Sequence, residues 1–479
     1  MILGILITLA FFVLLLARLE FFQRKEESVA TRQISKSELH QDTWMNIYQN
    51  NKKIGVIHRT FTGIGKQFHF NETVLMQINT MGTTQALNIL TEGDLNPDMT
   101  LSSFNFNLNS GIFRFNAHGS VIKNKLILFT GSPDAQEKNE ISLKDIPHIS
   151  DNIYVTAMHA DLQKDSTRSF SIFDPSTISI RSIKVTRNAD EIIKIMGNRI
   201  LTKKYCADFM GTKNCAWLSK EGDVVKETGI LGMSMEKVDR QKALEGFNAG
   251  GSIDFTQISS IRSNINISEP DKLRGLKIKI GGIGKDLYLN NDRQTYHDSI
   301  LNITKEHLPS LSALNNNLSK EISIYLKPSA LIQSNSQQIK NQVEKIIKPT
   351  DSARQKAAKI VYWVFSNLEK KPTLSVPNAL EVLKNKSGDC NEHSVLTVAL
   401  LRAAGIPAQT EAGLVYLRGR FYYHEWCVLY LGKWITADAV FNQFPADVTH
   451  IMLVRGDSEL LNLMGAISKI KLEISEQIQ

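Results

Sequence analysis

Three residues in the C-terminal third of the chain have the types and the order of a thiol-based catalytic set. The first, Cys390, follows a Gly388-Asp389 turn and opens an apolar run that stops at Gly405-Ile406-Pro407, a pattern typical of a helix that begins at the cysteine. The positive end of a helix dipole stabilises a thiolate, which is the nucleophilic form of cysteine. The sequence therefore predicts a nucleophile at Cys390.

Two partners for this thiol follow in the chain. Residues 421–430 and 434–439 have the pattern of two strands of a hairpin that turns at Gly432-Lys433. Side chains alternate along a strand, so His424 and Trp426 share one face, while Cys427 points to the other and is expected to pack in the core. Asp438 falls on the strand beside His424. An imidazole next to a carboxylate and facing a thiol is the arrangement of base, orienting residue and nucleophile.

These segments resemble those of a known family. Gly-Asp-Cys at 388–390, Leu-Arg-Ala-Ala-Gly-Ile-Pro-Ala at 401–408, His-x-Trp at 424–426 and Trp-x-x-x-Asp at 434–438 are similar to motifs of the transglutaminase-like superfamily of papain-fold thiol enzymes. The resemblance implies that Cys390 is the nucleophile, His424 the general base and acid, and Asp438 the residue that orients the imidazole. Ala439 and Val440 depart from the Asp-Pro-Thr-Phe-Asn-Gln sequence that is common in a bacterial branch.

Such a set attacks an amide or peptide carbonyl and leaves a thioester on Cys390. Water as the second acceptor gives hydrolysis and an amine gives cross-linking, and the motif is the same for both reactions. We expect hydrolysis of a protein or peptide substrate, because many bacterial members of the superfamily resemble proteases and amidases. The alternative is a catalytically silent scaffold or binding protein of the cell envelope.

Other polar residues around the motif have non-catalytic interpretations. His393 and Glu392 are expected to be solvated or to support the site from behind. No Cys/His pair of the sequence has metal-ligand spacing, and no Asp-rich loop has that of a calcium site. The sequence therefore predicts neither a metal nor a cofactor.

Two amphipathic stripes precede Cys390 and predict helices that pack beside it. The first contains Ile339, Val343 and Ile346, and the second contains Ile360 and Val364. Thr350 or Asp351 is the expected cap of the second helix. Helices on one side of an antiparallel sheet that carries the base define an α+β domain, which we place at residues 336–479.

The middle of the chain has a different pattern. Residues 42–255 contain short alternating strands separated by turns such as 96–98, which predicts antiparallel β-rich domains in one or two modules. Strand-like segments at 276–280 and 322–326 extend this pattern into a linker module over 256–335. Cys206 and Cys215 are placed to bridge a hairpin. The predicted fold class is α+β, with β-rich domains in front of a transglutaminase-like (papain-like) domain.

The N-terminus and the overall charge suggest where the protein works. Residues 1–17 carry no charge, which predicts a transmembrane helix over 1–22 that anchors the protein in the membrane, followed by a polar linker over 23–41. Basic residues after the span favour the cytoplasm, whereas similar bacterial proteins favour the envelope. We expect a single-pass membrane protein with an extracytoplasmic soluble part. The charge of +8 is scattered without a nucleic-acid motif, so no nucleic-acid partner is expected. The oligomeric state is not predicted.

Overall fold

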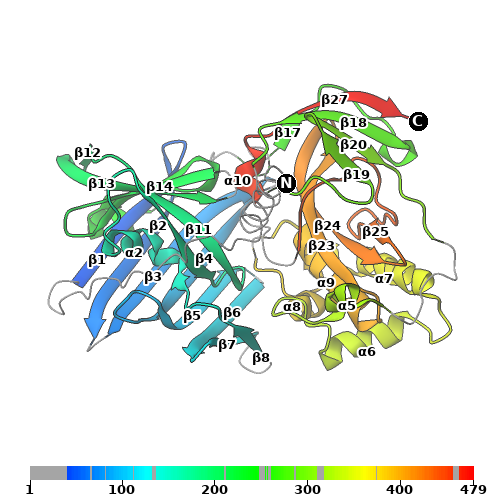
Figure 1. The fold of residues 1–479 in the computed structure, drawn as a ribbon, viewed down its shortest axis with the longest axis horizontal. Coiled ribbons are helices and arrows are strands. Elements are labelled where there is room, and N and C mark those ends of the chain that lie inside the picture. The colour runs from blue at the N-terminus through cyan, green and yellow to red at the C-terminus, as the bar shows by residue number, and fades with distance from the viewer. Residues whose placement is uncertain are drawn as a thin grey trace, which may run out of the picture.

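The computed structural model describes residues 40–479 except 65–66, 81, 112, 132–135, 210–211, 247–253, 255, 257–259, 285–286, 310–317, 374 and 457–462. Figure 1 shows two lobes side by side, an N-terminal lobe of strands and a C-terminal lobe in which sheets and helices mix. Strands take 49% of the chain and helices 20%. The predicted α+β class is therefore wrong, because the chain is mostly β and its longer helices are confined to the C-terminal lobe.

One large sheet of 16 strands, antiparallel except where β9 pairs with β10, builds the N-terminal lobe. Its first half is a meander that runs from β8 back to β1, and β1 then pairs with β16, from which the sheet continues to β9. The first half consists of β1 (His40–Gln49), β2 (Lys52–Ile64), β3 (Gln67–Thr80), β4 (Thr83–Leu95), β5 (Leu101–Ser110), β6 (Phe113–Ile122), β7 (Lys125–Thr130) and β8 (Glu137–Ser142). The second consists of β9 (His148–Ile149), β10 (Thr167–Asp174), β11 (Ser179–Arg187), β12 (Glu191–Ile195), β13 (Asn198–Phe209), β14 (Thr212–Leu218), β15 (Val224–Thr228) and β16 (Met233–Val238).

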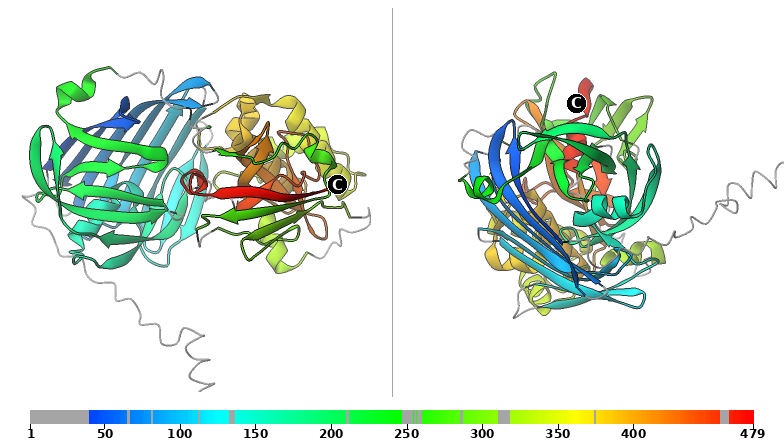
Figure 2. Two further views of the ribbon diagram at one scale, coloured as in Figure 1. Left: turned by 90° about the horizontal axis from the view of Figure 1, so that it is seen from above. Right: turned by 90° about the vertical axis from the view of Figure 1, so that its left-hand side faces the viewer.

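Alternating apolar residues make this sheet curl around one core. Along β5, for example, Phe104, Phe106 and Leu108 are buried, while the residues between them are half-buried. Phe104 meets Phe173 of β10 with ring centroids 4.8 Å apart, so the two halves of the sheet face each other. The end-on view in Figure 2 shows the strands wrapping around this interior. The short helix α2 (Ile153–His159) adds Ile153 and Val155 to the same core.

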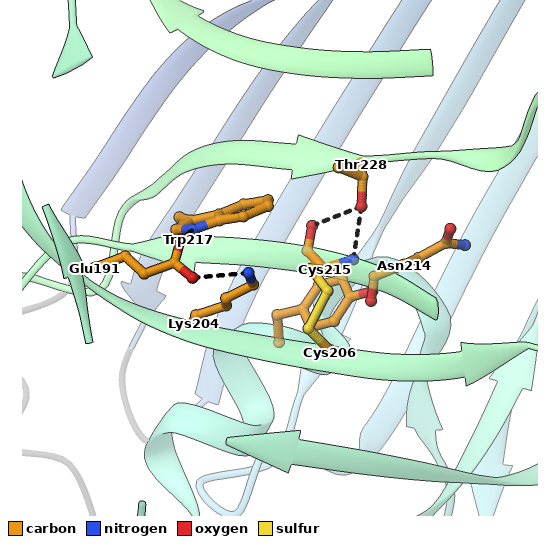
Figure 3. The surroundings of a disulfide bond; sticks show 8 residues. Glu191, Lys204, Cys206, Asn214, Cys215, Trp217 and Thr228 are labelled. Carbon is orange, nitrogen blue, oxygen red and sulfur yellow. Dashed lines mark hydrogen bonds and ion pairs between the residues drawn. A yellow bond between two sulfur atoms is a disulfide. The ribbon is translucent and has the colours of Figure 1, made fainter. Parts of the chain in front are cut away.

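A disulfide joins two neighbouring strands of the second half. Cys206 of β13 lies opposite Cys215 of β14, and the two sulfur atoms are bonded at 2.03 Å (Figure 3). Thr228 Oγ1 of β15 accepts from the Cys215 backbone N–H at 2.8 Å. Close by, Glu191 accepts from Trp217 Nε1 at 2.7 Å and pairs with Lys204 at 2.8 Å. The prediction that these cysteines bridge a hairpin is confirmed.

Two larger sheets, a two-stranded sheet of β21 (Glu369–Lys370) and β22 (Ser387–Gly388), and a helical layer form the C-terminal lobe. A five-stranded sheet orders β17, β24, β23 and β26, with β25 on the other part of β24, and a four-stranded sheet orders β19, β20, β18 and β27. The strands are β17 (Ser260–Arg262), β18 (Gly275–Gly281), β19 (Gln294–His297), β20 (Ile300–Thr304), β23 (Ala408–Leu417), β24 (Arg420–Tyr430), β25 (Trp434–Ala437), β26 (Ile451–Arg455) and β27 (Lys471–Ile478). The segment around 260–304 thus shares strands with the region that carries the candidate site.

The helices pack on one face of the five-stranded sheet. They are α5 (Lys320–Ser323), α6 (Gln337–Ile346), α7 (Ala353–Asn367), α8 (Ala379–Asn385) and α9 (Cys390–Ala403). The two predicted amphipathic stripes are confirmed in α6 and α7, but Ser352 caps α7 in place of Thr350 or Asp351. The segment 322–326 is helical, so the strand predicted there is wrong.

The two lobes share part of a core. Leu331 and Val376, from loops of the C-terminal lobe, are buried among the apolar side chains of the N-terminal sheet. Gln85 Nε2 of β4 donates to the Pro372 carbonyl at 3.0 Å, and Thr130 Oγ1 of β7 donates to the Ala330 carbonyl at 3.4 Å. In Figure 1 the helix α10 (Leu463–Ile467) lies between the lobes, where it contacts the turn at Ile230–Gly232.

The predicted membrane anchor is not supported. Residues 1–22, where the transmembrane helix was expected, lie outside the described residues. Among the residues that are described, no helix is long and apolar enough to cross a membrane. The longest of them, α7, has 15 residues against the roughly 20 that a span requires, and its apolar face packs in the protein core. This finding contradicts the prediction of a single-pass membrane protein.

Candidate active site

Cys390 is the first residue of α9, as the sequence predicts. Asp389 caps this helix by accepting from the Asn391 backbone N–H at 2.9 Å, and Glu392 reaches back to the Asp389 N–H at 2.8 Å. This reciprocal capping fixes the helix start where the thiol is attached. Gly388 is required just before it, because a Cβ at this position would lie 2.3 Å from the Glu392 Cβ.

The surroundings of the thiol differ from the expectation based on the helix dipole. Burial raises the pKa of Cys390 well above its ordinary value, and the carboxylates of Asp389, Glu425 and Glu392 raise it further, against a backbone hydrogen bond at Glu425 that lowers it. These surroundings favour the neutral thiol over the thiolate.

His424 and Asp438 form a buried pair. His424 lies on β24, and Asp438 follows the last residue of β25, which pairs with the same strand. His424 Nε2 lies 2.7 Å from Asp438 Oδ2. The other carboxylate oxygen accepts from the backbone N–H groups of Val440 at 2.6 Å and Phe441 at 3.3 Å. Asp438 therefore holds the imidazole in one orientation and is itself held by the turn that follows it.

A second histidine, which the sequence analysis missed, joins this pair. His450 Nε2 lies 2.9 Å from the same Asp438 oxygen, and its Nδ1 lies 3.3 Å from Asp447 Oδ1. Burial alone would raise the pKa of Asp438, but the hydrogen bonds and charges of His424 and His450 outweigh it and hold that pKa well below its usual range. The signal in the sequence was Asp447-Val448-Thr449-His450, a polar cluster directly before the apolar β26.

His424, Asp438 and His450 also have the residue types of a metal site, and their ligand atoms lie within 4.8 Å of one another. Both imidazole nitrogens point at one carboxylate oxygen at 2.7 and 2.9 Å, which are hydrogen-bond distances. An ion bound at about 2.0–2.2 Å from nitrogen and oxygen needs a wider separation of these atoms. The geometry therefore fits a hydrogen-bonded chain better than a metal centre.

The thiol and the imidazole line one cavity of about 620 Å³. Its walls are largely apolar and include Val415, Leu417 and Phe441. Lys370 and Lys371 contribute positive charge, and both side chains are exposed. The remaining lining residues are Gly82, Asp254, Thr256, Pro372, Gly388, Asp389, His393, Tyr422, Tyr423 and Val440, with Cys390 and His424. Gly82 lies between β3 and β4, so the N-terminal lobe forms part of the wall.

Three further sequence interpretations can be compared with the structure. His393 and Glu392 are each 1% exposed, so the solvated interpretation is wrong and a supporting position is correct. His393 Nδ1 lies 2.7 Å from the Asp389 carbonyl, and burial lowers the pKa of this imidazole. Cys427 is 1% exposed within the core between sheet and helices, which confirms a packing role.

Comparison with known proteins identifies the class of this region. Residues 340–439 match the model of the transglutaminase-like superfamily, which confirms the predicted resemblance to this family of thiol enzymes over that segment. No curated protein matches the chain.

Several solved structures are similar to parts of the chain. One is a candidate cysteine protease from Cytophaga hutchinsonii, with 15% identity, 41% of this chain and 83% of that chain covered, and a TM-score of 0.29. Another is a β-barrel-like protein of unknown function from Brucella abortus, with 10% identity, 43% and 98% covered, and a TM-score of 0.33. A candidate protease from Parabacteroides distasonis has 12% identity, 78% and 64% covered, and a TM-score of 0.21. With TM-scores this low, these likenesses decide nothing about function.

Proposed function

We propose that this chain is a thiol hydrolase that cleaves amide bonds in protein or peptide substrates. Cys390 is the nucleophile, His424 carries the proton, and Asp438 orients the imidazole. The observation that supports this most directly is the 2.7 Å hydrogen bond between His424 Nε2 and Asp438 Oδ2 at the wall of a cavity that Cys390 also lines. The family match over residues 340–439 supports the same chemistry.

The hydrogen bond to Asp438 determines which nitrogen of His424 exchanges protons. Nε2 donates to the carboxylate, which leaves Nδ1 as the acceptor for the Cys390 proton. As Sγ attacks the carbonyl carbon, this proton moves to Nδ1 and then to the leaving amine, and a thioester forms. Water then gives one proton to Nδ1 while its oxygen attacks the thioester, which releases the acid and restores the thiol.

The environment of Cys390 defines how the first step begins. Because burial raises the pKa of the thiol, the resting site contains a neutral thiol and not a preformed ion pair. Proton transfer to His424 therefore accompanies the attack on the carbonyl. A substrate that fills the apolar cavity also removes water from around both groups, which strengthens the interaction between them.

Cross-linking remains the competing outcome of the same thioester. The two reactions are distinguished by adding a primary amine to a turnover assay and identifying the products by their masses in mass spectrometry. A hydrolase yields the free acid and little amide, whereas a cross-linking enzyme yields the amide as the main product.

A silent scaffold is the second candidate, and the raised pKa of the Cys390 thiol favours it. The deciding experiment treats the full chain with a peptide that carries a thiol-directed electrophile in place of the scissile amide. An enzyme is labelled at Cys390, and the rate falls at least about 100-fold in His424→Ala, in line with the loss of a general base. Cys390→Ser is the negative control, and Cys427→Ser shows that the buried cysteine is not the target. Slow labelling of Cys390 at a rate that is the same in the wild type and in His424→Ala would refute the enzymatic proposal.

A further inference from the structure

His450 lies behind the His424–Asp438 pair, and no step of the mechanism above uses it. Its side chain is fully buried. Its Nε2 and that of His424 approach the same oxygen of Asp438, at 2.9 and 2.7 Å. Two imidazoles thus share one carboxylate oxygen. The protonation state of one imidazole therefore changes how strongly the carboxylate interacts with the other.

The far side of His450 is also occupied by a carboxylate. Its Nδ1 lies 3.3 Å from Asp447 Oδ1. Asp447 is held as an acceptor by Gln443 Nε2 at 2.8 Å and by the Thr449 N–H and hydroxyl at 2.8 and 2.6 Å. Both ring nitrogens of His450 therefore face acceptors, and only the doubly protonated imidazolium donates to both of them.

The other groups around His450 isolate this charge from water. The rings of Trp426 and Phe441 lie edge-on to it, with centroids at 5.1 and 6.2 Å. Arg293 binds the backbone carbonyl of His450 at 2.9 Å, and its own charge is balanced by Glu306 at 3.2 Å.

Two more titratable side chains among the described residues interact electrostatically with this carboxylate, His393 of α9 and the buried thiol of Cys427. Burial raises the pKa of Cys427, so this thiol adds no charge at neutral pH. Burial lowers the pKa of His393, so this imidazole adds no charge at neutral pH. The balance at Asp438 is therefore set by His424 on one side and His450 on the other.

We propose that His450 is a positioning residue that sets the pH range in which the Cys390–His424 pair works, by sharing the Asp438 carboxylate with His424. This inference rests on the proposed function. The imidazolium anchors Asp438 and takes up part of its negative charge. The negative charge that His424 faces is consequently smaller than that of an unshared carboxylate, and the pH range in which the pair reacts depends on it.

The protonation of His450 agrees with this role. Burial by itself would lower the pKa of this residue, but the hydrogen bonds and charges of Asp438 and Asp447 raise it to about 9. The residue therefore keeps its charge through the neutral range, in which a thiol hydrolase with a histidine base operates.

The test measures the rate of Cys390 labelling by the peptide electrophile between about pH 5 and pH 9 in the full chain. In His450→Gln, which keeps a donor but removes the charge, the acid limb of the profile moves upward by about one pH unit. Asp447→Asn removes the anion behind His450 and moves the limb in the same direction by less. Thr449→Val removes a hydrogen bond to Asp447 without a change of charge and leaves the limb in place.

Two outcomes would overturn the proposal. The first is a His450→Gln variant that still unfolds in one cooperative thermal transition and whose labelling is slower at all pH values but whose acid limb does not move, since this indicates packing alone. The second comes from an experiment that does not depend on activity, NMR of the histidine-labelled Cys390→Ser chain. It is expected to show His450 protonated on both nitrogens up to about pH 8, as a pKa of about 9 implies. A neutral His450 at pH 7 refutes the inference, whereas a wild-type chain without reactive Cys390 refutes only the proposed function.

Discussion

Arg293 holds the backbone of His450 from a neighbouring sheet. Its Nη2 donates to the carbonyls of His450 at 2.9 Å and Asp447 at 2.8 Å, and its Nη1 donates to the Ala446 carbonyl at 2.9 Å and to Thr436 Oγ1 at 3.0 Å. The residue lies just before β19 of the four-stranded sheet. The loop between β25 and β26 is therefore fixed by a part of the chain that carries none of the proposed catalytic groups.

Replacing this guanidinium is expected to destabilise the protein strongly. Arg293→Met leaves Glu306 without its ion pair and several buried carbonyls without their donor, which costs about 3–5 kcal/mol of unfolding free energy. Denaturant unfolding monitored by tryptophan fluorescence measures this loss. The exposed Arg262→Met is the matched control and is expected to stay within about 0.5 kcal/mol of the wild type. A loss below about 1 kcal/mol for Arg293→Met would mean that water can replace the guanidinium.

Removing the charge of Asp438 is expected to abolish most of the reactivity of Cys390. The amide of Asp438→Asn cannot accept from both imidazoles with the strength of a carboxylate, so His424 loses its fixed orientation. The labelling rate falls by about 10²–10⁴-fold. Asp161→Asn, at an exposed position of the N-terminal lobe, removes the same charge and is expected to react like the wild type. Retention of full reactivity in Asp438→Asn would exclude Asp438 as the orienting residue.

The stability of the protein is expected to fall in mildly alkaline solution. The pKa of His450 is raised from 6.5 to about 9 in the folded chain, so the folded state binds this proton more tightly than the unfolded state does. The resulting stabilisation is complete below pH 6.5 and is lost as the pH rises through about 9. Its size is about 3 kcal/mol for a shift of this magnitude. Denaturant unfolding measured at several pH values across this window gives the slope of unfolding free energy against pH, and this slope should be smaller in His450→Gln. An unchanged slope would mean that other groups cause the pH dependence.

Loss of the disulfide is expected to weaken the N-terminal sheet without affecting the site. The bond closes a short loop between residues nine apart in sequence, for which chain entropy gives about 2–3 kcal/mol. The double substitution Cys206→Ser and Cys215→Ser should lower the unfolding free energy by that amount. Labelling of Cys390 should continue at the wild-type rate, since the disulfide lies on the N-terminal lobe and not at the cavity. A large drop in labelling would show that the outer strands of the sheet transmit strain to the cavity.

The contact between the lobes at the cavity is expected to influence binding more than chemistry. Gln85 donates to the Pro372 carbonyl, and Pro372 lines the cavity. Gln85→Ala removes this hydrogen bond to Pro372 and also the one from the same amide to Thr80 Oγ1. The loss of the bond to Pro372, about 1 kcal/mol, is expected to weaken the first, reversible binding of the peptide electrophile by about fivefold. The rate at saturation should be unchanged. Thr84→Val alters the same hairpin at its contact with Asn79 and serves as the control; a fall in the saturated rate of Gln85→Ala would contradict this assignment.

The candidate site was partly accessible from the sequence because its three proposed members stand in local patterns. Cys390 opens an apolar helix, and His424 and Asp438 lie on either side of a short hairpin loop at 431–433. The roles of His450 and Arg293 could not be predicted in this way. They are 157 residues apart and meet only because the four-stranded sheet packs against the loop before β26. The thiol pKa was misjudged for a similar reason, since the helix start is local whereas burial and the neighbouring carboxylates come from the whole fold.

The fold, like the site, could be predicted where the sequence pattern is local and not where it depends on contacts between distant segments. Alternating residues predicted the strands of the N-terminal lobe, but the pairing of β1 with β16 depends on contacts far apart in the chain. Likewise β27 completes a sheet whose other strands precede the helices. In 322–326 the alternation of isoleucine and serine favoured a strand, yet the segment is helical, because the tertiary environment overrides a weak propensity. The fold class was misjudged because the extent of the N-terminal sheet was not apparent from its individual strands.

Leu331 and Val376 have a consequence for how the protein can be divided. Both side chains complete the core of the opposite lobe. Separating the lobes would therefore leave cavities in the core of the N-terminal fragment and expose two apolar side chains on the C-terminal fragment. The two halves should therefore melt in a single cooperative transition and should be poor candidates for modular exchange. Any replacement for the N-terminal sheet would have to provide an apolar core into which these two side chains pack, and would have to restore the cavity wall at Gly82.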